Sequence, residues 1–148
     1  MRNPVEVIPE AAQPIQALYG AVFKSGVPPK TIALIHLRIS QINGCAPCVD
    51  GGAKHAKKDG ETDERLFAIP VWREAPYYTG AERAALELAE AATRLSDRPD
   101  AVPDRVWDAA TRHFDESGMA GLLLAIAVTN VFNRLNVPTR QVAGAQKW

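Results

Sequence analysis

The sequence lacks the features that would assign it to several specialised classes of protein. Its 17 basic residues are balanced by 17 acidic ones, so no charge excess would attract nucleic acid or an anionic membrane surface. The longest nearly unbroken apolar run, residues 119–128, is too short to span a bilayer. No stretch shows sustained strand-like alternation of polar and apolar residues. We therefore expect a protein that binds neither nucleic acid nor membranes and that contains no extensive sheet.

The composition is that of an ordinary globular protein. Hydrophobic residues make up 47% of the 148 residues and charged residues 23%, which suits one domain, residues 1–148, with a hydrophobic core. Residues 1–6 lack the apolar core of a signal peptide, so the reducing cytoplasm is the expected compartment. In that compartment a pair of nearby cysteines is more often catalytic or metal-binding than a structural crosslink.

Helical periodicity runs through the chain and predicts a compact all-α bundle of about seven helices. The segment 31–42 is apolar over much of its circumference, so we expect it to be the central helix. A capping box at residues 79–82 predicts the start of another helix. A helix beginning near Pro103 is expected to turn Trp107 inward. The very apolar segment 118–134 is expected to lie either in the core or at an oligomer interface.

Both cysteines lie in one C-x-x-C motif, Cys45-Ala46-Pro47-Cys48, directly after an Asn-Gly helix breaker. Pro47 suits the first turn of a helix, so the pair is predicted at a helix N-terminus, where free N–H groups favour a thiolate. Such a thiolate can attack a peroxide, and a second thiol one turn away can then close a disulfide. An external dithiol has to regenerate the pair. By position alone, Cys48 is expected to be the more protected, attacking thiol and Cys45, nearer the exposed end, the resolving thiol.

Two other interpretations of the motif are a zinc site and a pair of inert buried thiols. A structural zinc site commonly needs four ligands, and the chain offers only these two cysteines and three scattered histidines, His36, His55 and His113. A C-x-x-C motif at a helix start, in a chain with no other cysteine, also makes inert thiols the weaker interpretation. We therefore favour a redox function for the pair and expect no metal and no cofactor.

The segment 37–50, LRISQINGCAPCVD, resembles the signature of the alkylhydroperoxidase AhpD-like family, which is grouped with the carboxymuconolactone decarboxylases. Five further stretches match the usual family pattern: Lys54, 60–62, 65–66, 72–74 and 82–86. The resemblance implies an all-helical AhpD-like fold that assembles into homo-oligomers, often trimers or hexamers. It also implies thiol peroxidase or disulfide reductase activity, with Cys48 as the peroxidatic and Cys45 as the resolving thiol. The implied substrate is a peroxide or another small molecule, and the implied reductant is an external dithiol protein.

The chain departs from the family pattern at two positions of the proposed proton relay. Ala33 stands where the family usually carries a glutamate, and Gly52 stands where it usually carries a histidine. Each lost residue has a histidine three residues further on, His36 and His55, and residues i and i+3 share a helix face. We hypothesise that His36 serves as the base or proton shuttle near the pair, since imidazole titrates near neutral pH.

For each histidine a structural interpretation stands beside the functional one. His36 is as well explained as a polar residue satisfied inside an apolar helix. His55 is expected to be solvated beside Lys54 and Lys57, and His113 is expected to be a surface or capping group near a helix end.

Three functions remain open from the sequence. The leading one is a peroxidase or disulfide oxidoreductase that uses Cys45 and Cys48. The second is cofactor-free proton chemistry on a lactone, as in the decarboxylase branch, with the C-x-x-C motif incidental. The third is a non-enzymatic, redox-sensing oligomer, which the loss of the family glutamate and histidine at Ala33 and Gly52 supports.

Overall fold

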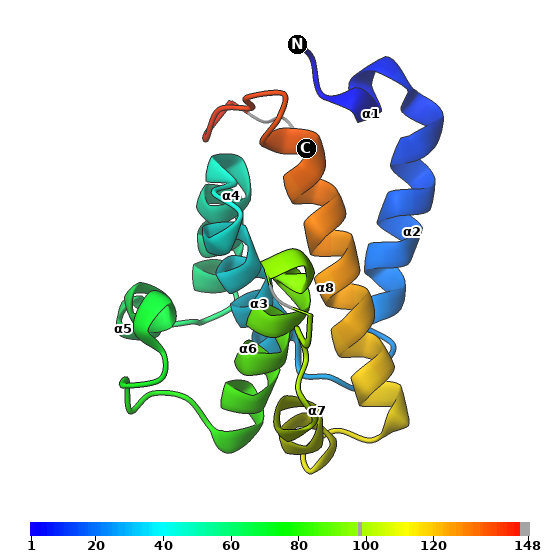
Figure 1. Cartoon of the computed structure of the whole chain (residues 1–148). Helices are drawn as coiled ribbons and strands as arrows, with labels where there is room; N and C mark the ends of the chain where they lie inside the picture. The colour runs from blue at the N-terminus through cyan, green and yellow to red at the C-terminus, as the bar shows by residue number, and fades with distance from the viewer. Residues whose placement is uncertain (98, 146–148) are drawn as a thin grey trace.

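The computed structural model describes residues 1–97 and 99–145, and within these ranges the regular structure is entirely helical (Figure 1). This confirms the all-α prediction, with eight α-helices and three short 3₁₀-helices in the described part of the chain. In order they are α1 (Pro4–Val7), η1 (Pro9–Ala11), α2 (Ala12–Val22), α3 (Pro29–Ile42), α4 (Ala46–Lys58), α5 (Asp63–Ala68), η2 (Ile69–Val71), α6 (Gly80–Thr93), η3 (Leu95–Asp97), α7 (Asp104–Thr111) and α8 (Glu116–Asn136).

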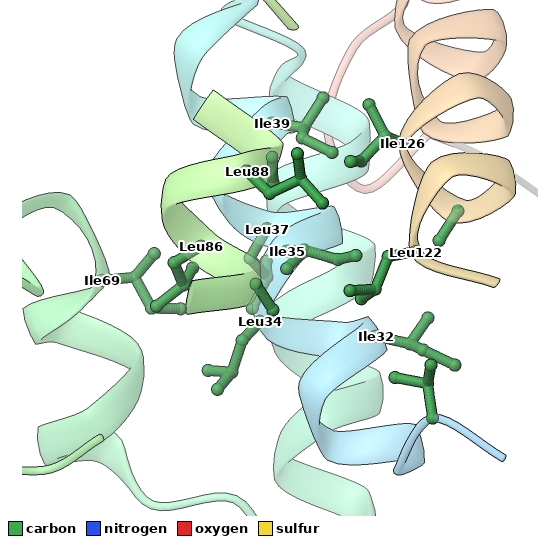
Figure 2. Close-up of a cluster of buried hydrophobic side chains, with 14 of the residues drawn as sticks. Ile32, Leu34, Ile35, Leu37, Ile39, Ile69, Leu86, Leu88, Leu122 and Ile126 are labelled. Carbon is green, nitrogen blue, oxygen red and sulfur yellow. The ribbon is translucent and has the colours of Figure 1, made fainter. Parts of the chain in front are cut away.

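Helix α3 is the central element, and α4, α6 and α8 pack around it (Figure 1). Five of its side chains are almost completely buried: Ile32, Leu34, Ile35, Leu37 and Ile39. Figure 2 shows them between side chains of α8 on one side, Leu122 and Ile126, and side chains of α6 on the other, Leu86 and Leu88. Burying a large aliphatic side chain contributes about 1.5–3 kcal/mol. The apolar circumference read from the sequence therefore corresponds to a helix covered on several sides.

A tight cap at the end of α3 determines where the cysteine motif begins. Gly44 has a φ of +68°, a left-handed conformation that glycine adopts without a steric penalty. Its N–H donates to the carbonyl of Gln41 at 3.2 Å, and the N–H of Cys45 donates to the carbonyl of Ser40 at 2.9 Å. These two bonds form a Schellman motif. The chain therefore reverses within two residues, and Cys45 becomes the N-cap of α4.

The predicted helix starts are confirmed where a capping residue marked them. At α6 the Thr79 hydroxyl accepts from the N–H of Glu82 at 3.2 Å, and the Glu82 carboxylate accepts from the N–H of Thr79 at 2.8 Å.

The prediction for Trp107 was wrong, since this side chain is 41% exposed. Val106 and Ala110, one turn apart, take the buried face of α7, so the neighbouring Trp107 is rotated about 100° away.

Helix α8 is long and apolar enough to cross a membrane, judged by length and composition alone. Half of its most apolar stretch is nevertheless buried inside the fold, where α8 packs against α2, α3 and α6. Leu123 and Leu124 lie on its outer face and are 38% and 39% exposed. The helix therefore has the surroundings of a core helix, with an apolar strip left uncovered.

A buried carboxylate joins α3 and α6 to the segment that precedes α6. Glu90 accepts hydrogen bonds from Arg38 at 2.5 Å, from Arg73 at 2.8 Å and from the indole N–H of Trp72 at 3.1 Å. Burial raises the pKa of Glu90, but the bonds from Arg73, Trp72 and Arg38 outweigh burial and hold the pKa below its ordinary value. The ionised carboxylate therefore contributes to the stability of the fold.

We expect Glu90→Gln to lower the free energy of unfolding by about 2–3 kcal/mol at neutral pH, because it leaves Arg38, whose side chain is only 15% exposed, without its counter-charge. A depressed folded-state pKa means that the native state binds fewer protons than the unfolded chain. The contribution is therefore complete above the ordinary value of 4.5 and is lost as the pH falls below it. Urea unfolding across this range should show the gap between parent and variant narrowing toward low pH. A gap of constant size would contradict this account.

Candidate active site around Cys45 and Cys48

The two cysteines are joined at the N-terminus of α4, as the motif predicted. Cys45 is the N-cap of this helix, and Cys48 lies in its first turn. Their Cα atoms are 5.3 Å apart, and their sulfur atoms form a disulfide bond. Neither the Cys45 side chain nor another side chain caps the helix at this residue. The positive end of the helix dipole therefore remains directed at the pair, which favours negative charge on a sulfur.

The expectation that Cys45 lies nearer the exposed end was wrong. Cys45 is 1% exposed and Cys48 is 8% exposed, so Cys48 is the slightly more accessible thiol. The reason is the cap at the end of α3, which ties the backbone of Cys45 to Ser40 and turns it into the interior. Cys48 follows one turn later, closer to the surface. Of the two cysteines, Cys48 is therefore the one that is more accessible from the surface.

Helix α8 places two side-chain amides directly on the sulfur atoms. The Nδ2 of Asn133 donates to the Sγ of Cys48 at 3.2 Å. The Nδ2 of Asn136 donates to the same sulfur at 3.3 Å and to the Sγ of Cys45 at 3.7 Å. Both asparagines are 1% exposed. Because hydrogen bonds to the charged form of a group favour ionisation, these two donors stabilise a thiolate on Cys48 more than one on Cys45.

The donor end of Asn133 is fixed by a chain of oriented amides that starts at Asn130. The Nδ2 of Asn130 donates to the carbonyl of Ile126 at 2.9 Å, and its Oδ1 accepts from the guanidinium of Arg134 at 2.7 Å. A carbonyl only accepts and a guanidinium only donates, so the amide of Asn130 has one possible orientation.

The fixed orientation of Asn130 determines how Asn43 binds, and Asn43 in turn determines which end of Asn133 faces Cys48. The Nδ2 of Asn43 donates to the Oδ1 of Asn130 at 3.0 Å and to the Oδ1 of Asn133 at 2.8 Å. With its oxygen engaged, Asn133 turns its Nδ2 toward Cys48 and toward the Oγ of Ser40, which lies at 3.2 Å. Reversing Asn133 would set its NH₂ group against the NH₂ group of Asn43, so that two donors would face each other. The donor at Cys48 is therefore built into the fold.

The sequence interpretation missed these asparagines, although a signal for them was present. Asn130, Asn133 and Asn136 recur at a spacing of three residues in an otherwise apolar helix. Such a spacing places them along one face. A polar stripe on a buried helix needs partners inside the protein. Asn43, two residues before Cys45, belongs to the Asn-Gly helix breaker and carries no further sequence signal of its own.

His36 lies against the backbone of Cys48, and its ring occupies the space beside Gly52. A Cβ atom added at Gly52 would lie 3.0 Å from the Cδ2 and 3.3 Å from the Nε2 of His36. The Nδ1 of His36 lies 3.3 Å from the hydroxyl oxygen of Thr129. Burial lowers the pKa of His36, a hydrogen bond to the backbone of Cys48 opposes this, and the charge of His55 lowers the pKa further. The lowered pKa means that the imidazole of His36 is neutral at neutral pH.

These positions bear on the histidine hypotheses in different ways. The hydrogen bonds of His36 go to Thr129 and to the backbone of Cys48, so the structure brings His36 to the motif but leaves its relay function a prediction. His55 is exposed, and its Nδ1 lies 2.8 Å from the carbonyl oxygen of Gly51. His113 is exposed and lies against Gly80 at the start of α6.

A separate cleft of about 910 Å³ opens at the other end of α4. It is bounded by the segment 25–31, the end of α4, the start of α6 and the segment between α7 and α8. Ala33, which stands at the position of the family glutamate, and Ala56 lie on its wall. Ala56 follows Cys48 by eight residues, which is roughly 12 Å along the helix axis. The cleft therefore does not open directly on the sulfur atoms.

Fold and site together define an all-α protein with a buried C-x-x-C disulfide at a helix N-terminus. Residues 9–91 match the carboxymuconolactone decarboxylase family, and the chain belongs to this family. It is 34% identical to the uncharacterized protein YdfG of Bacillus subtilis over 132 residues, 89% of this chain and 88% of that protein. It is 35% identical to the uncharacterized protein YnjA of Escherichia coli over 114 residues, 76% of this chain but 60% of YnjA.

Solved structures agree with this assignment. ATU0492 of Agrobacterium tumefaciens, described as a protein of unknown function and a candidate AhpD antioxidant defence protein, superposes with a TM-score of 0.89. The identity is 35%, and the match covers 97% of both chains. The debrominase Bmp8 superposes with a TM-score of 0.83 at 21% identity, covering 95% of this chain and 75% of Bmp8, and this likeness concerns the fold alone. The predicted AhpD-like fold is confirmed.

We expect Asn133→Ala to raise the pKa of Cys48 in the reduced protein by about one unit. The variant removes one of the two donors to the sulfur, and a hydrogen bond to a charged group contributes about 1.5 kcal/mol. The pKa is measured from the pH dependence of alkylation of Cys48, with the modified cysteine located by mass spectrometry. Asn130→Ala is the comparison, because Asn130 touches no sulfur and acts on Asn133 only through Asn43, so its shift should be clearly smaller. Equal shifts in the two variants would refute a direct effect of the Asn133 donor.

Proposed function

We propose that this protein is a thiol-dependent peroxidase or disulfide oxidoreductase that works through Cys45 and Cys48. The observation that carries the proposal is the Cys45–Cys48 disulfide at the start of α4, with two oriented amide donors on Cys48. A structural crosslink between residues three apart would constrain little chain, and it would not need donors aimed at one of its sulfur atoms. Donors of this kind lower the pKa of a reactive thiol.

The proposed cycle balances without a cofactor. The thiolate of Cys48 attacks one oxygen of a peroxide, so a sulfur–oxygen bond forms, the oxygen–oxygen bond breaks, and the sulfur loses two electrons. The departing oxygen takes up a proton and leaves as an alcohol or as water. The thiol of Cys45 then attacks the sulfenic sulfur, releases water and closes the disulfide. An external dithiol protein restores both thiols by exchange and is itself oxidised to a disulfide.

His36 supplies the base in this proposal. A histidine at position 52 would project from α4 one turn beyond Cys48, and the ring of His36 lies in that space instead. Because burial keeps His36 neutral, it can accept the proton of Cys48 and return it to the departing oxygen. The exchange of a histidine from α4 to α3 thus compensates for Gly52, while the glutamate lost at Ala33 has no counterpart of this kind.

The surroundings of the pair bear on substrate and partners. With 8% of Cys48 exposed, a small hydroperoxide reaches the sulfur more easily than a bulky one.

We also propose that the chain forms homo-oligomers and works in the cytoplasm. Several large apolar side chains remain exposed and support self-assembly: Phe67, Val71, Tyr77, Leu123 and Leu124.

The test of the proposed activity is stoichiometric. One equivalent of hydrogen peroxide or of an alkyl hydroperoxide should consume both thiols of the reduced protein and leave the intramolecular Cys45–Cys48 disulfide. Cys48→Ser should abolish peroxide consumption, because it removes the attacking thiolate. Cys45→Ser should still react once and stop at a sulfenic acid on Cys48, which a sulfenic-acid-specific nucleophile traps. Consumption at the parental rate by Cys48→Ser would overturn the proposal.

A second candidate function is cofactor-free proton chemistry on a lactone, and the cleft near Ala33 and Ala56 favours it. This cleft is remote from the thiols and is lined by Glu61, Glu82 and His113. Carboxylates and an imidazole in a cleft suit cofactor-free proton chemistry of the decarboxylase type. Lactone turnover that survives complete alkylation of the thiols would support this function. Ordinary pKa values for both cysteines, without turnover of either kind, would leave a redox-sensing scaffold.

The histidine exchange makes a separate prediction. His36→Ala should slow peroxide reduction at neutral pH by at least about tenfold, because it removes the base. His36→Ala combined with Gly52→His should recover part of the rate, since the new imidazole enters the space that His36 leaves once the flexible side chain of Leu37, whose Cδ2 would lie 3.0 Å from the new Cβ, moves aside. His36→Ala combined with Gly51→His is the matched control, because a Cβ at Gly51 meets no neighbouring atom within 4 Å. Unchanged kinetics in His36→Ala, or equal recovery in both double variants, would exclude the proposed function of His36.

A further inference from the structure

The short N-terminal segment, residues 1–8, is connected to the redox pair through one buried side chain. We call this segment the N-terminal arm. Asn3 is 2% exposed, although its neighbours Met1 and Arg2 are exposed. Its Nδ2 donates to the Oδ1 of Asn136 at 2.7 Å, across 133 positions of sequence. Asn136 is the residue whose amide reaches both sulfur atoms.

The polarity of this connection is set by the backbone of the arm. The Oδ1 of Asn3 accepts from the N–H of Val5 at 3.0 Å and caps α1. A backbone N–H can only donate, so the oxygen of Asn3 must face Val5 and its NH₂ group must face Asn136. That NH₂ group can only donate in turn, so Asn136 must present its oxygen to Asn3. The NH₂ group of Asn136 is thereby left facing Cys48 and Cys45.

We propose that Asn3 is a positioning residue for the redox pair: it fixes the amide of Asn136 with its donor toward the sulfurs and so makes the N-terminal arm part of the site. This inference rests on the proposed function in taking Cys48 as the reactive thiol. It adds a residue that lies more than 40 positions before the motif and outside the segment matched to the family, residues 9–91. Asn3 acts through Asn136 and does not touch sulfur in the described contacts.

No charged group described near the cysteines takes the place of the amide donors on the Cys48 sulfur. Arg2 and Glu6 of the arm are exposed. On α8 the guanidinium of Arg134 binds Asn130, and on α4 the carboxylate of Asp50 binds Lys54 at 2.8 Å. On α3, neutral His36 binds the backbone of Cys48. In the described contacts, the polar groups that touch the Cys48 sulfur from α8 are neutral amides, so their orientation decides whether they stabilise negative charge.

The test exchanges donor and acceptor in the hydrogen bond between Asn3 and Asn136 while keeping the cap of α1. In Asn3→Asp one carboxylate oxygen can still cap α1, since aspartate is also a good N-cap. The other oxygen can only accept, so Asn136 has to turn its NH₂ group toward it and its oxygen toward Cys48. The rate at which Cys48 of the reduced protein is alkylated at neutral pH should fall about tenfold, and its pKa should rise accordingly.

Asn3→Ser separates this effect from the charge of the aspartate. Serine keeps the cap and is neutral, but it lacks the amide that orients Asn136, so alkylation should slow about threefold. A residue with a merely structural role would lower the free energy of unfolding in urea without moving the pKa of Cys48. Parental alkylation rates in Asn3→Ser, or an unmoved Cys48 pKa in Asn3→Asp, would overturn the inference.

Alkylation does not require peroxidase activity, so the two proposals can fail separately. If peroxide leaves the thiols intact while Asn3→Asp still raises the Cys48 pKa, the positioning function of Asn3 stands and the proposed activity falls. If peroxide oxidises the pair normally and neither Asn3 variant moves the pKa, the proposed activity stands and the inference about Asn3 falls.

Discussion

A thiol buried among apolar helices loses its proton only if the groups around it stabilise the resulting charge, and here those groups are amides. Burial by itself raises the pKa of a thiol, because it removes water from the charged form. Two NH₂ groups from α8, with the start of α4, oppose that penalty at Cys48. The amides are not free to turn, because each oxygen is engaged by another donor, from Asn43 or from Asn3. The rest of the site depends on this fixed polarity.

The remainder of the fold serves to bring three distant parts of the chain to one point. The glycine cap after α3 reverses the chain and seats Cys45, helix α8 delivers Asn133 and Asn136, and the N-terminal arm delivers Asn3. The apolar packing of α3 against α6 and α8 holds the helices that carry these residues in fixed positions relative to one another. The donors that touch the Cys48 sulfur from α8 are neutral amides, and their contribution does not require the glutamate and histidine of the family pattern. The departures at Ala33 and Gly52 are then compatible with a reactive thiol.

Much of this organisation could be predicted from the sequence, and the limits are informative. The helix start at the cysteines followed from Pro47 and the glycine breaker, and the centrality of α3 followed from its apolar circumference. These features are local, so nearby residues reveal them. The exposure order of Cys45 and Cys48 was predicted wrongly, because a cap between two helices determines it. The contacts of Asn3 with Asn136, and those of the α8 asparagines with Asn43 and the cysteines, join residues more than 80 positions apart, and no local pattern reveals such pairings. The placement of His36 over Gly52 likewise needed the packing of α3 against α4.

The most direct test of this account is the pKa of Cys48 in the reduced parent protein, from the pH dependence of its alkylation beside that of Cys45. Oriented amide donors at a helix N-terminus should hold the pKa of Cys48 below the ordinary cysteine value of about 8.5 and below that of Cys45. A Cys48 pKa at or above about 8.5, or a lower value at Cys45, would contradict the central claim that the amides of α8 make Cys48 the reactive thiol.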